Sequence, residues 1–129
     1  MATLTEQQLA LLRAKSFAAV ATLQEDGTPQ TSIVWIDTDG EHVIFNTTNA
    51  RAKGRHLRRD PRVSIAIFDP AEPYAYFEVE GTATLVVDGA DEHINTLSQK
   101  YRGADFHTPS DRVIVKVKPK RIFDYISPS

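Results

Sequence analysis

The sequence contains no cysteine and only one tryptophan and one methionine among its 129 residues. Without cysteine, disulfide bridges, thiolate nucleophiles, cysteine-ligated zinc and iron–sulfur clusters are excluded. Low-complexity tracts and internal repeats are also lacking, and the hydrophobic and charged fractions of 41% and 25% are ordinary for a globular protein. We therefore expect one domain, spanning residues 1–129, whose chemistry uses groups other than sulfur.

Long hydrophobic runs are missing as well. No apolar stretch approaches the roughly 20 residues needed to span a bilayer, and the N-terminus lacks the basic, apolar and small-residue order of a signal peptide. We expect a cytoplasmic protein without a membrane partner. A net charge of −2 and a pI near 6.1 also argue against nucleic-acid binding, for which a strongly basic domain is expected.

Motifs for metal binding and for hydrolysis are absent too. The four histidines, His42, His56, His93 and His107, show no metal-ligand spacing, so we predict no metal site. His56 is expected to point into solvent, because its place on the predicted helix turns it away from Arg51. No serine lies in a nucleophile elbow. We therefore assign no catalytic side chain.

Positive charge, in contrast, is concentrated in one short segment. Six of the fifteen Lys and Arg residues lie between Arg51 and Arg62, where Asp60 is the only acidic residue, so the segment carries +5 (six minus one). The remainder carries nine basic and sixteen acidic residues, or −7. An acidic protein that gathers its cations in one place is expected to bind an anion there. The alternative is a solvated helix whose charges avoid one another.

Hydrophobic periodicity and turn signals predict three helices and about seven strands. The helices are expected at residues 6–15, which follow a Thr5–Gln8 capping box, and at residues 50–60 and 91–101. The strands are expected at residues 17–23, 30–37, 42–46, 63–68, 74–87, 113–118 and 121–126, the first three forming a meander. Mostly short hairpin connections favour an α+β fold with a barrel-like antiparallel sheet and flanking helices.

The predicted basic helix has distinct faces. Gly54 and Leu57 share the side that we expect to be buried, while Arg51 and Lys53 flank it near the helix start. A helix N-terminus exposes unpaired amides and a partial positive charge. Arg51, a forked donor, and Lys53, a point charge, would complete a phosphate-sized nest there, beside the short donors that precede the helix. Trp35, on the second strand, is expected in the core rather than in contact with a ligand.

Several short motifs follow one another in a characteristic order. They are a capped helix, Val-Ala-Thr-Leu, Asp-Gly-x-Pro-Gln-x-Ser-x-Val-Trp, Asn-Thr-x-x-Ala-Arg-Ala-Lys-Gly-Arg-x-Leu, Asp-Pro-Arg-Val and Glu-Gly-x-Ala. In this order they resemble the pyridoxamine 5′-phosphate oxidase-like split β-barrel family, and in particular its small branch of deazaflavin-dependent reductases, which bind coenzyme F420. The resemblance covers roughly residues 9–126. No single motif is specific, but the ordered set is.

The resemblance implies a split β-barrel homodimer with two cofactor sites at the subunit interface. It implies that Arg51 and Lys53 hold the cofactor phosphate beside Thr47, and that the strand around Ile33 lines the deazaflavin ring. Tyr74 and Tyr76 would come from the partner subunit to lie over the ring or the substrate. The complete set of implied cofactor-binding residues is Ser32, Ile33, Val34, Asn46, Thr47, Arg51, Ala52, Lys53, Tyr74 and Tyr76.

The implied activity is hydride transfer from reduced F420 to a planar conjugated small molecule, such as a quinone, an enone or a tetrapyrrole. Pyridoxamine oxidation is disfavoured, because the chain lacks the C-terminal segment with which the parent oxidases grip pyridoxal phosphate. FMN is the alternative cofactor, since it also offers a phosphate and a planar ring. The longer anionic tail of F420 would account for the cations at Arg55, Arg58 and Arg59. A binding module that holds flavin, deazaflavin or haem without turnover is a further alternative.

Overall fold

A computed structural model describes residues 2–106 and 111–126 of the chain. In chain order its elements are α1 Glu6–Arg13, β1 Phe17–Leu23, β2 Pro29–Val34, β3 Asp37–Thr38, β4 Val43–Thr48, α2 Ala52–Arg59, β5 Arg62–Asp69, β6 Glu72–Val86, α3 Ala90–Arg102 and β7 Arg112–Asp124. The predicted helices are confirmed to within a few residues. Two corrections concern strands: the last two predicted strands form the continuous β7, and a separate two-residue β3 follows β2.

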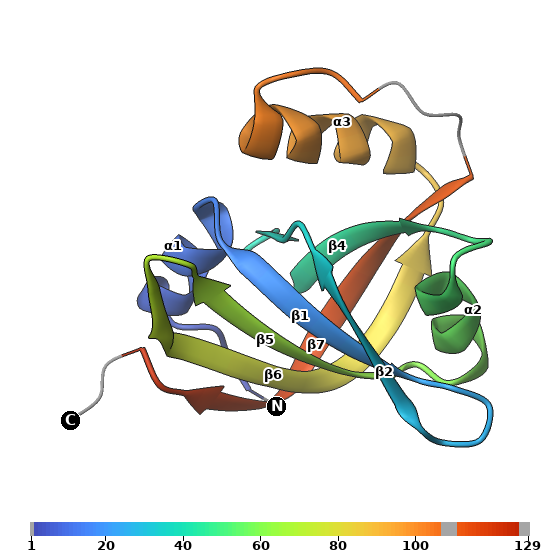
Figure 1. Cartoon of the computed structure of the whole chain (residues 1–129), viewed down its shortest axis with the longest axis horizontal. Helices are drawn as coiled ribbons and strands as arrows, with labels where there is room; N and C mark the ends of the chain where they lie inside the picture. Colours follow the sequence, from blue (N-terminus) through green and yellow to red (C-terminus); the bar gives the residue numbers. More distant parts are fainter. Residues whose placement is uncertain (1, 107–110, 127–129) are drawn as a thin grey trace.

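All the strands pair into one antiparallel sheet in the order β2-β1-β5-β6-β7-β4-β3. Figure 1 shows the sheet curling into an open half-barrel, with α3 across the top and α2 at the right. The α+β class with a barrel-like antiparallel sheet is therefore confirmed. The predicted meander is wrong, because β4 pairs with β7 and not with β2. Residues 43–47 of β4 are all buried, and a strand covered on both faces needs a place inside the sheet and beneath a helix.

The core lies inside the half-barrel. Along β1 and β5, buried residues alternate with partly exposed ones, as expected for a sheet with one covered face. Val20, Ile65 and Val79 are paired across β1, β5 and β6, and none of them is exposed. Burying each such side chain contributes about 1.5–3 kcal/mol. The inner row of the sheet thus supplies much of the stability that positions the site.

The outer face of β1 and β5 is lined by small side chains. Ala19 pairs with Ala66 and Ala21 with Ser64, and all four are partly exposed. Next to them on β2 lies Ile33, whose exposed fraction is 60%. Phe17 and Phe68 share this side of the two strands, and Glu78 and Glu80 of β6 pair with Ala66 and Ser64, so the surface combines small, aromatic and acidic residues. Within residues 2–106 and 111–126, no helix combines the length and the apolar character needed to cross a bilayer.

Candidate functional site

The basic helix α2 begins directly after β4, across a tight connection. Asn49 is tied to Asp111, because its backbone amide donates to the Asp111 carbonyl oxygen (3.0 Å) and its Nδ2 to the Asp111 Oδ1 (3.0 Å). The Arg51 amide donates to Thr48 Oγ1 (3.1 Å), and Arg51 is the N-cap residue. The Arg51 side chain does not cap the helix, so amides of the first turn stay available to another acceptor.

Gly54 allows α2 to approach β4 closely. A Cβ at this position would lie 2.3 Å from the Thr48 carbonyl oxygen, far inside van der Waals contact. Gly54 and Leu57 are both buried, so the predicted buried face is confirmed. This close contact fixes the distance between the first turn of α2 and the end of β4. It thereby also fixes the position of the cations on α2.

The prediction for His56 is wrong, because this side chain is buried. Only 8% of His56 is exposed, and its Nδ1 lies 2.9 Å from Thr22 Oγ1 on β1. Burial, and after it the positive charges of Arg59 and Arg55, lowers the pKa of His56. The sequence analysis predicted a single buried face for this helix, but α2 contacts both β1 and β4 and so has two covered faces.

A cavity of about 260 Å³ opens where the end of β2, the end of β4, the start of α2 and one face of α3 meet. Its lining residues are Phe17, Ile33, Val34, Trp35, Asn46, Arg51, Lys53, Ile94, Leu97, Phe106 and Arg112. Among the predicted site residues, the structure brings together Ile33, Val34, Asn46, Arg51 and Lys53. The cavity is therefore apolar along β2 and α3, and cationic toward α2 and β7.

Three cations, Arg51, Lys53 and Arg112, meet at this cavity. Lys53 Nζ donates to Ser32 Oγ (3.0 Å), a contact that joins α2 to β2. Burial, and after it the charge of Arg51, lowers the pKa of both Lys53 and Arg112, although Asp91 opposes the effect on Arg112. In the part of the chain that the structure describes, none of the three forms an ion pair. Mutually repelling cations at one opening form a site for an anion.

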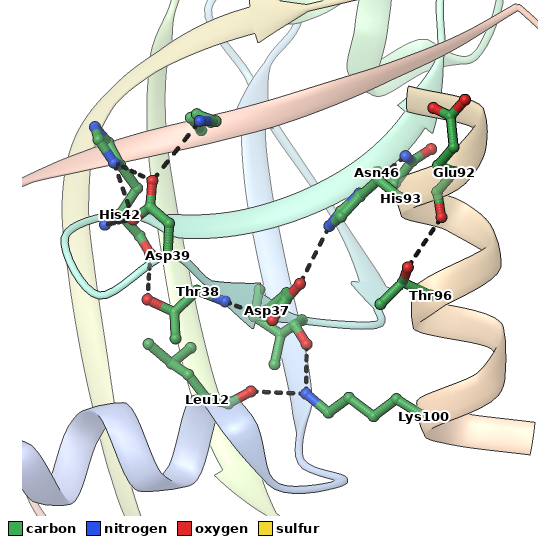
Figure 2. Close-up of polar contacts among 12 residues, drawn as sticks. Leu12, Asp37, Thr38, Asp39, His42, Asn46, Glu92, His93, Thr96 and Lys100 are labelled. Atoms are coloured by element: carbon green, nitrogen blue, oxygen red, sulfur yellow. Dashed lines mark hydrogen bonds and ion pairs between the residues drawn. The ribbon is translucent and has the colours of Figure 1, made fainter. Parts of the chain in front are cut away.

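A chain of polar side chains connects the cavity to the interior. Arg112 Nη1 donates to Asn46 Oδ1 (3.3 Å), and Asn46 Nδ2 lies 3.1 Å from His93 Nδ1. Figure 2 shows His93, on α3, lying between Asn46 and Asp37, whose Oδ2 is 3.3 Å from His93 Nε2. The guanidinium of Arg112 also lies over the ring of Phe106, 4.7 Å from its centroid. Asn46 is thus both a wall of the cavity and a link to buried groups.

Other predicted site residues lie beside the cavity or away from it. Ser32 touches it only through Lys53, and Ala52 is the first residue of α2. Thr47 is fully buried, and its Oγ1 has no hydrogen-bond partner in the part of the chain that the structure describes. Alternate strand residues face opposite sides, so Thr47 faces away from the cavity that Asn46 lines.

The two tyrosines of β6 do not line this cavity. Tyr74 is 91% exposed. Tyr76 stacks on Tyr125, with their ring centroids 4.9 Å apart. Tyr74 is thus a fully accessible side chain, whereas Tyr76 is half-buried against Tyr125.

Sequence reasoning missed several of the lining residues. Trp35 was expected in the core, but it is partly exposed at the cavity, with its ring stacked on Tyr101 at 5.4 Å between centroids. Ile94 and Leu97 carried a signal, because their spacing marks the apolar face of α3. Nothing in the sequence indicated that Arg112 would meet Asn46, which lies 66 positions earlier.

A metal centre finds no support in the described ranges 2–106 and 111–126, where no three side chains of the metal-binding types converge. His107 lies outside the described residues.

Comparisons with known proteins bear on the family and the fold. A family model described as "Pyridoxamine 5′-phosphate oxidase" matches residues 4–125. A solved structure described as an F420 reductase is 34% identical to this chain, with 88% of this chain and 93% of that chain covered and a TM-score of 0.79.

Two more distant structures share the fold. A conserved hypothetical protein from Mycobacterium tuberculosis is 24% identical, with 94% of this chain and 85% of that chain covered and a TM-score of 0.74. HupZ from Group A Streptococcus is 22% identical, with 97% and 96% covered and a TM-score of 0.71.

Proposed function

Because the chain belongs to the pyridoxamine 5′-phosphate oxidase family, we propose that it is an oxidoreductase that binds coenzyme F420 and reduces a planar conjugated small molecule, such as a quinone, an enone or a tetrapyrrole. The observation that carries the proposal is the cavity itself, in which Arg51, Lys53 and Arg112 face an apolar and aromatic wall. A planar ring joined to a phosphate has the same two-sided chemistry. The choice of F420 is supported by the similarity to a protein described as an F420 reductase.

The residues divide into two groups by what they would hold. Arg51 and Lys53 would bind the phosphate, together with first-turn amides of α2, because charged donors and a helix N-terminus favour an anion. Ile33, Val34 and Trp35 would lie along the ring. When bound, the deazaflavin ring would supply the hydride chemistry, while the protein would supply position and electrostatics.

FMN competes with F420 for this assignment. The long anionic tail of F420 would bind the cations of α2 that the phosphate does not need, Arg55, Arg58 and Arg59. However, the guanidinium groups of Arg55 and Arg59 donate to the carbonyl oxygens of Ala50 and Leu23, which accounts for both cations without a ligand. Of the surplus cations on α2, only Arg58 then still favours the longer tail, so the cofactor has to be decided by direct binding.

We propose further that the protein is a homodimer whose cofactor sites lie at the subunit interface. A volume of about 260 Å³ is small for a site that must enclose a whole cofactor, since ligand pockets span about 300–1,000 Å³. The small side chains around Ala19 and Ala66 would let a second sheet approach closely. In such a dimer, the exposed Tyr74 and the stacked Tyr76 and Tyr125 of one protomer would be available to the cavity of the other.

Among the residues that the structure describes, the cavity lining offers no obvious donor for the proton that accompanies the hydride, because it contains no carboxylate and no histidine. We propose that solvent or one of the lining arginines delivers this proton. The same observation favours a second candidate function, a module that binds the cofactor without turnover.

One titration tests these alternatives. Purified protein is titrated with F420 and with FMN, and binding is followed by ligand fluorescence. We expect F420 to bind at micromolar levels, and reduced F420 to be oxidised by at least one of a panel of quinones, enones and biliverdin. Retention of FMN without F420 binding would overturn the cofactor assignment. Binding of F420 without oxidation by any member of the panel would favour the binding module.

A further inference from the structure

The polar chain behind the cavity links four elements of the fold. Asp37 lies on β3, His93 on α3, Asn46 on β4 and Arg112 on β7. Arg112 and Asn46 are only 6% and 8% exposed, and the His93 side chain is 13% exposed. Each contact is therefore made largely out of water, where a mismatched donor or acceptor is costly.

The orientation of the Asn46 amide is determined by two of its neighbours. Asn46 Nδ2 donates to the Ala90 carbonyl oxygen (3.0 Å), and Asn46 Oδ1 accepts from Arg112 Nη1 (3.3 Å). A rotated amide would place an oxygen against the Ala90 oxygen and an NH₂ group against a guanidinium. The second hydrogen of Nδ2 therefore points at His93 Nδ1, 3.1 Å away.

The hydrogen-bonding role of His93 follows from that orientation. Nδ1 accepts from Asn46, and Nε2 lies 3.3 Å from Asp37 Oδ2, at ion-pair distance but without the geometry of a hydrogen bond (Figure 2). Burial tends to raise the pKa of Asp37, but the contact with His93 and the Thr38 amide outweigh it, so this pKa lies below its ordinary value.

Arg112 has hydrogen-bonding capacity left over. Its Nε–H is buried and has no partner within the described residues, and Asn46 is the only side chain there to which its guanidinium donates. Within residues 2–106 and 111–126 no carboxylate forms an ion pair with it. Burial, and after it the like charge of Arg51, lowers its pKa, while Asp91 opposes the effect. A guanidinium has five N–H donors, and a buried one without a counter-ion is favoured by an anion in reach.

We infer that Arg112 is a third anion-binding cation of this cavity, and that His93, whose Nδ1 accepts from Asn46, positions its guanidinium through that amide. The inference rests on the proposed function, in which the anion is the cofactor phosphate. Protonation of His93 would turn Nδ1 into a donor that faces the Asn46 Nδ2 donor. The amide would then have to rotate and set its NH₂ group against Arg112, so acidification should release the guanidinium.

The charged groups around His93 set the sign of this effect. Asp37 faces its Nε2 from β3, Arg112 stands beyond Asn46 on β7, and Lys100 of α3 acts on Asp37. A protonated Nδ1 could not accept from Asn46. If His93 positions Arg112, affinity for the anion should therefore fall in acid.

The test measures F420 binding by fluorescence from about pH 8 to about pH 5, the range in which histidines titrate. Arg112→Met should weaken binding about tenfold or more, and Arg112→Lys, which keeps the charge without the fork, should lose less. His93→Leu should weaken binding about three- to tenfold. His93→Asn, which retains an acceptor near the Nδ1 position, should bind like wild type and should lack the wild-type decline in acid.

Two outcomes would overturn the inference while leaving the proposed function intact. One is an Arg112→Met variant that binds F420 like wild type when Lys53→Met binds weakly. The other is an equal decline in acid for wild type and His93→Asn. Thermal unfolding of each variant identifies any that fails to fold, in which case Arg112→Lys and His93→Asn carry the comparison.

A measurement without cofactor tests the positioning role of His93 independently of the proposed function. Nitrogen-15 NMR of the imidazoles should show His93 protonated at Nε2 and not at Nδ1 near pH 8; protonation at Nδ1 would overturn the positioning role. If wild type binds neither F420 nor FMN, the proposed function fails. A titration with inorganic pyrophosphate then decides the role of Arg112, which is refuted if Arg112→Met binds pyrophosphate as wild type does.

Discussion

Lys53→Met should weaken cofactor binding more than tenfold and leave the ligand-free fold no less stable. The Lys53 ammonium makes one hydrogen bond, to Ser32 Oγ at 3.0 Å. Against this contact stand its partial burial and the repulsion from Arg51, which together lower its pKa. Methionine keeps the aliphatic stem and removes both penalties. In the ligand-free protein the gains and losses should therefore nearly cancel.

The loss of affinity can be estimated from the bond that the ammonium would make to a phosphate. A hydrogen bond to a charged group contributes about 1.5–3 kcal/mol. At about 1.4 kcal/mol per factor of ten, this corresponds to a dissociation constant about 10- to 150-fold higher. Fluorescence titration with F420 gives the affinity, and urea denaturation of the same samples gives the free energy of unfolding.

The pH dependence of this site has a definite sign. The anion needs the ammonium form, so wild-type affinity should fall as pH rises through the pKa of Lys53, which lies below the ordinary 10.5. In the ligand-free protein, the unfolded chain holds this proton more tightly than the folded one. The free energy of unfolding therefore rises with pH between the two pKa values. Lys53→Met should lack both effects.

Arg58→Met is the matched control. It makes the same change of charge on the same helix, and Arg58 is exposed and without a hydrogen bond or ion pair among the residues described. Inorganic pyrophosphate has no tail that could reach Arg58, so equal weakening of pyrophosphate binding by both variants would refute the nest and favour a diffuse positive field. A large loss of stability in Lys53→Met with unchanged affinity would show that Lys53 serves the fold rather than a ligand.

Three further predictions concern packing, assembly and protonation. Gly54→Ala should lower the free energy of unfolding by about 1–3 kcal/mol in urea denaturation, because its Cβ would lie 2.3 Å from the Thr48 carbonyl oxygen; an unchanged value would contradict the close approach of α2. Ala66→Arg should produce a monomer in light scattering and abolish F420 binding; a persistent dimer with intact binding would place the interface elsewhere. The free energy of unfolding should fall as pH drops below the ordinary histidine pKa of 6.5, because burial, and after it the charges of Arg59 and Arg55, lowers the pKa of His56 in the folded state. In urea denaturation measured across pH, His56→Gln should show a smaller decline.

Short-range signals in the sequence were sufficient for most of the secondary structure. The Thr5–Gln8 capping box is present in both directions, since Thr5 Oγ1 accepts from the Gln8 amide (3.2 Å) and Gln8 Oε1 accepts from the Thr5 amide (2.9 Å). The predicted strand at residues 17–23 has the bounds of β1. Caps, turns and alternation depend on residues a few positions apart, which is why they can be recognised before the fold is known.

Part of the candidate site could also be predicted. The grouping of Arg51 and Lys53 at the start of a helix, directly after a strand that ends near Asn46, placed cations and an amide at one opening. The residues that other elements contribute to the cavity could not be predicted in this way. Phe106 and Arg112 follow a separate helix, and the order in which distant strands pair decides what lies opposite them.

Local patterns were sufficient to predict most of the elements, the buried face of α2 and the segment that collects positive charge. The pairing of β4 with β7, which sets Arg112 against Asn46, and the covering of α2 on two sides, which buries His56, became known only from the folded chain. The difference is one of range. Local hydrogen bonds and side-chain periodicity act over a few residues, whereas strand order follows from the summed burial of surfaces far apart in the chain, and no short pattern specifies that sum.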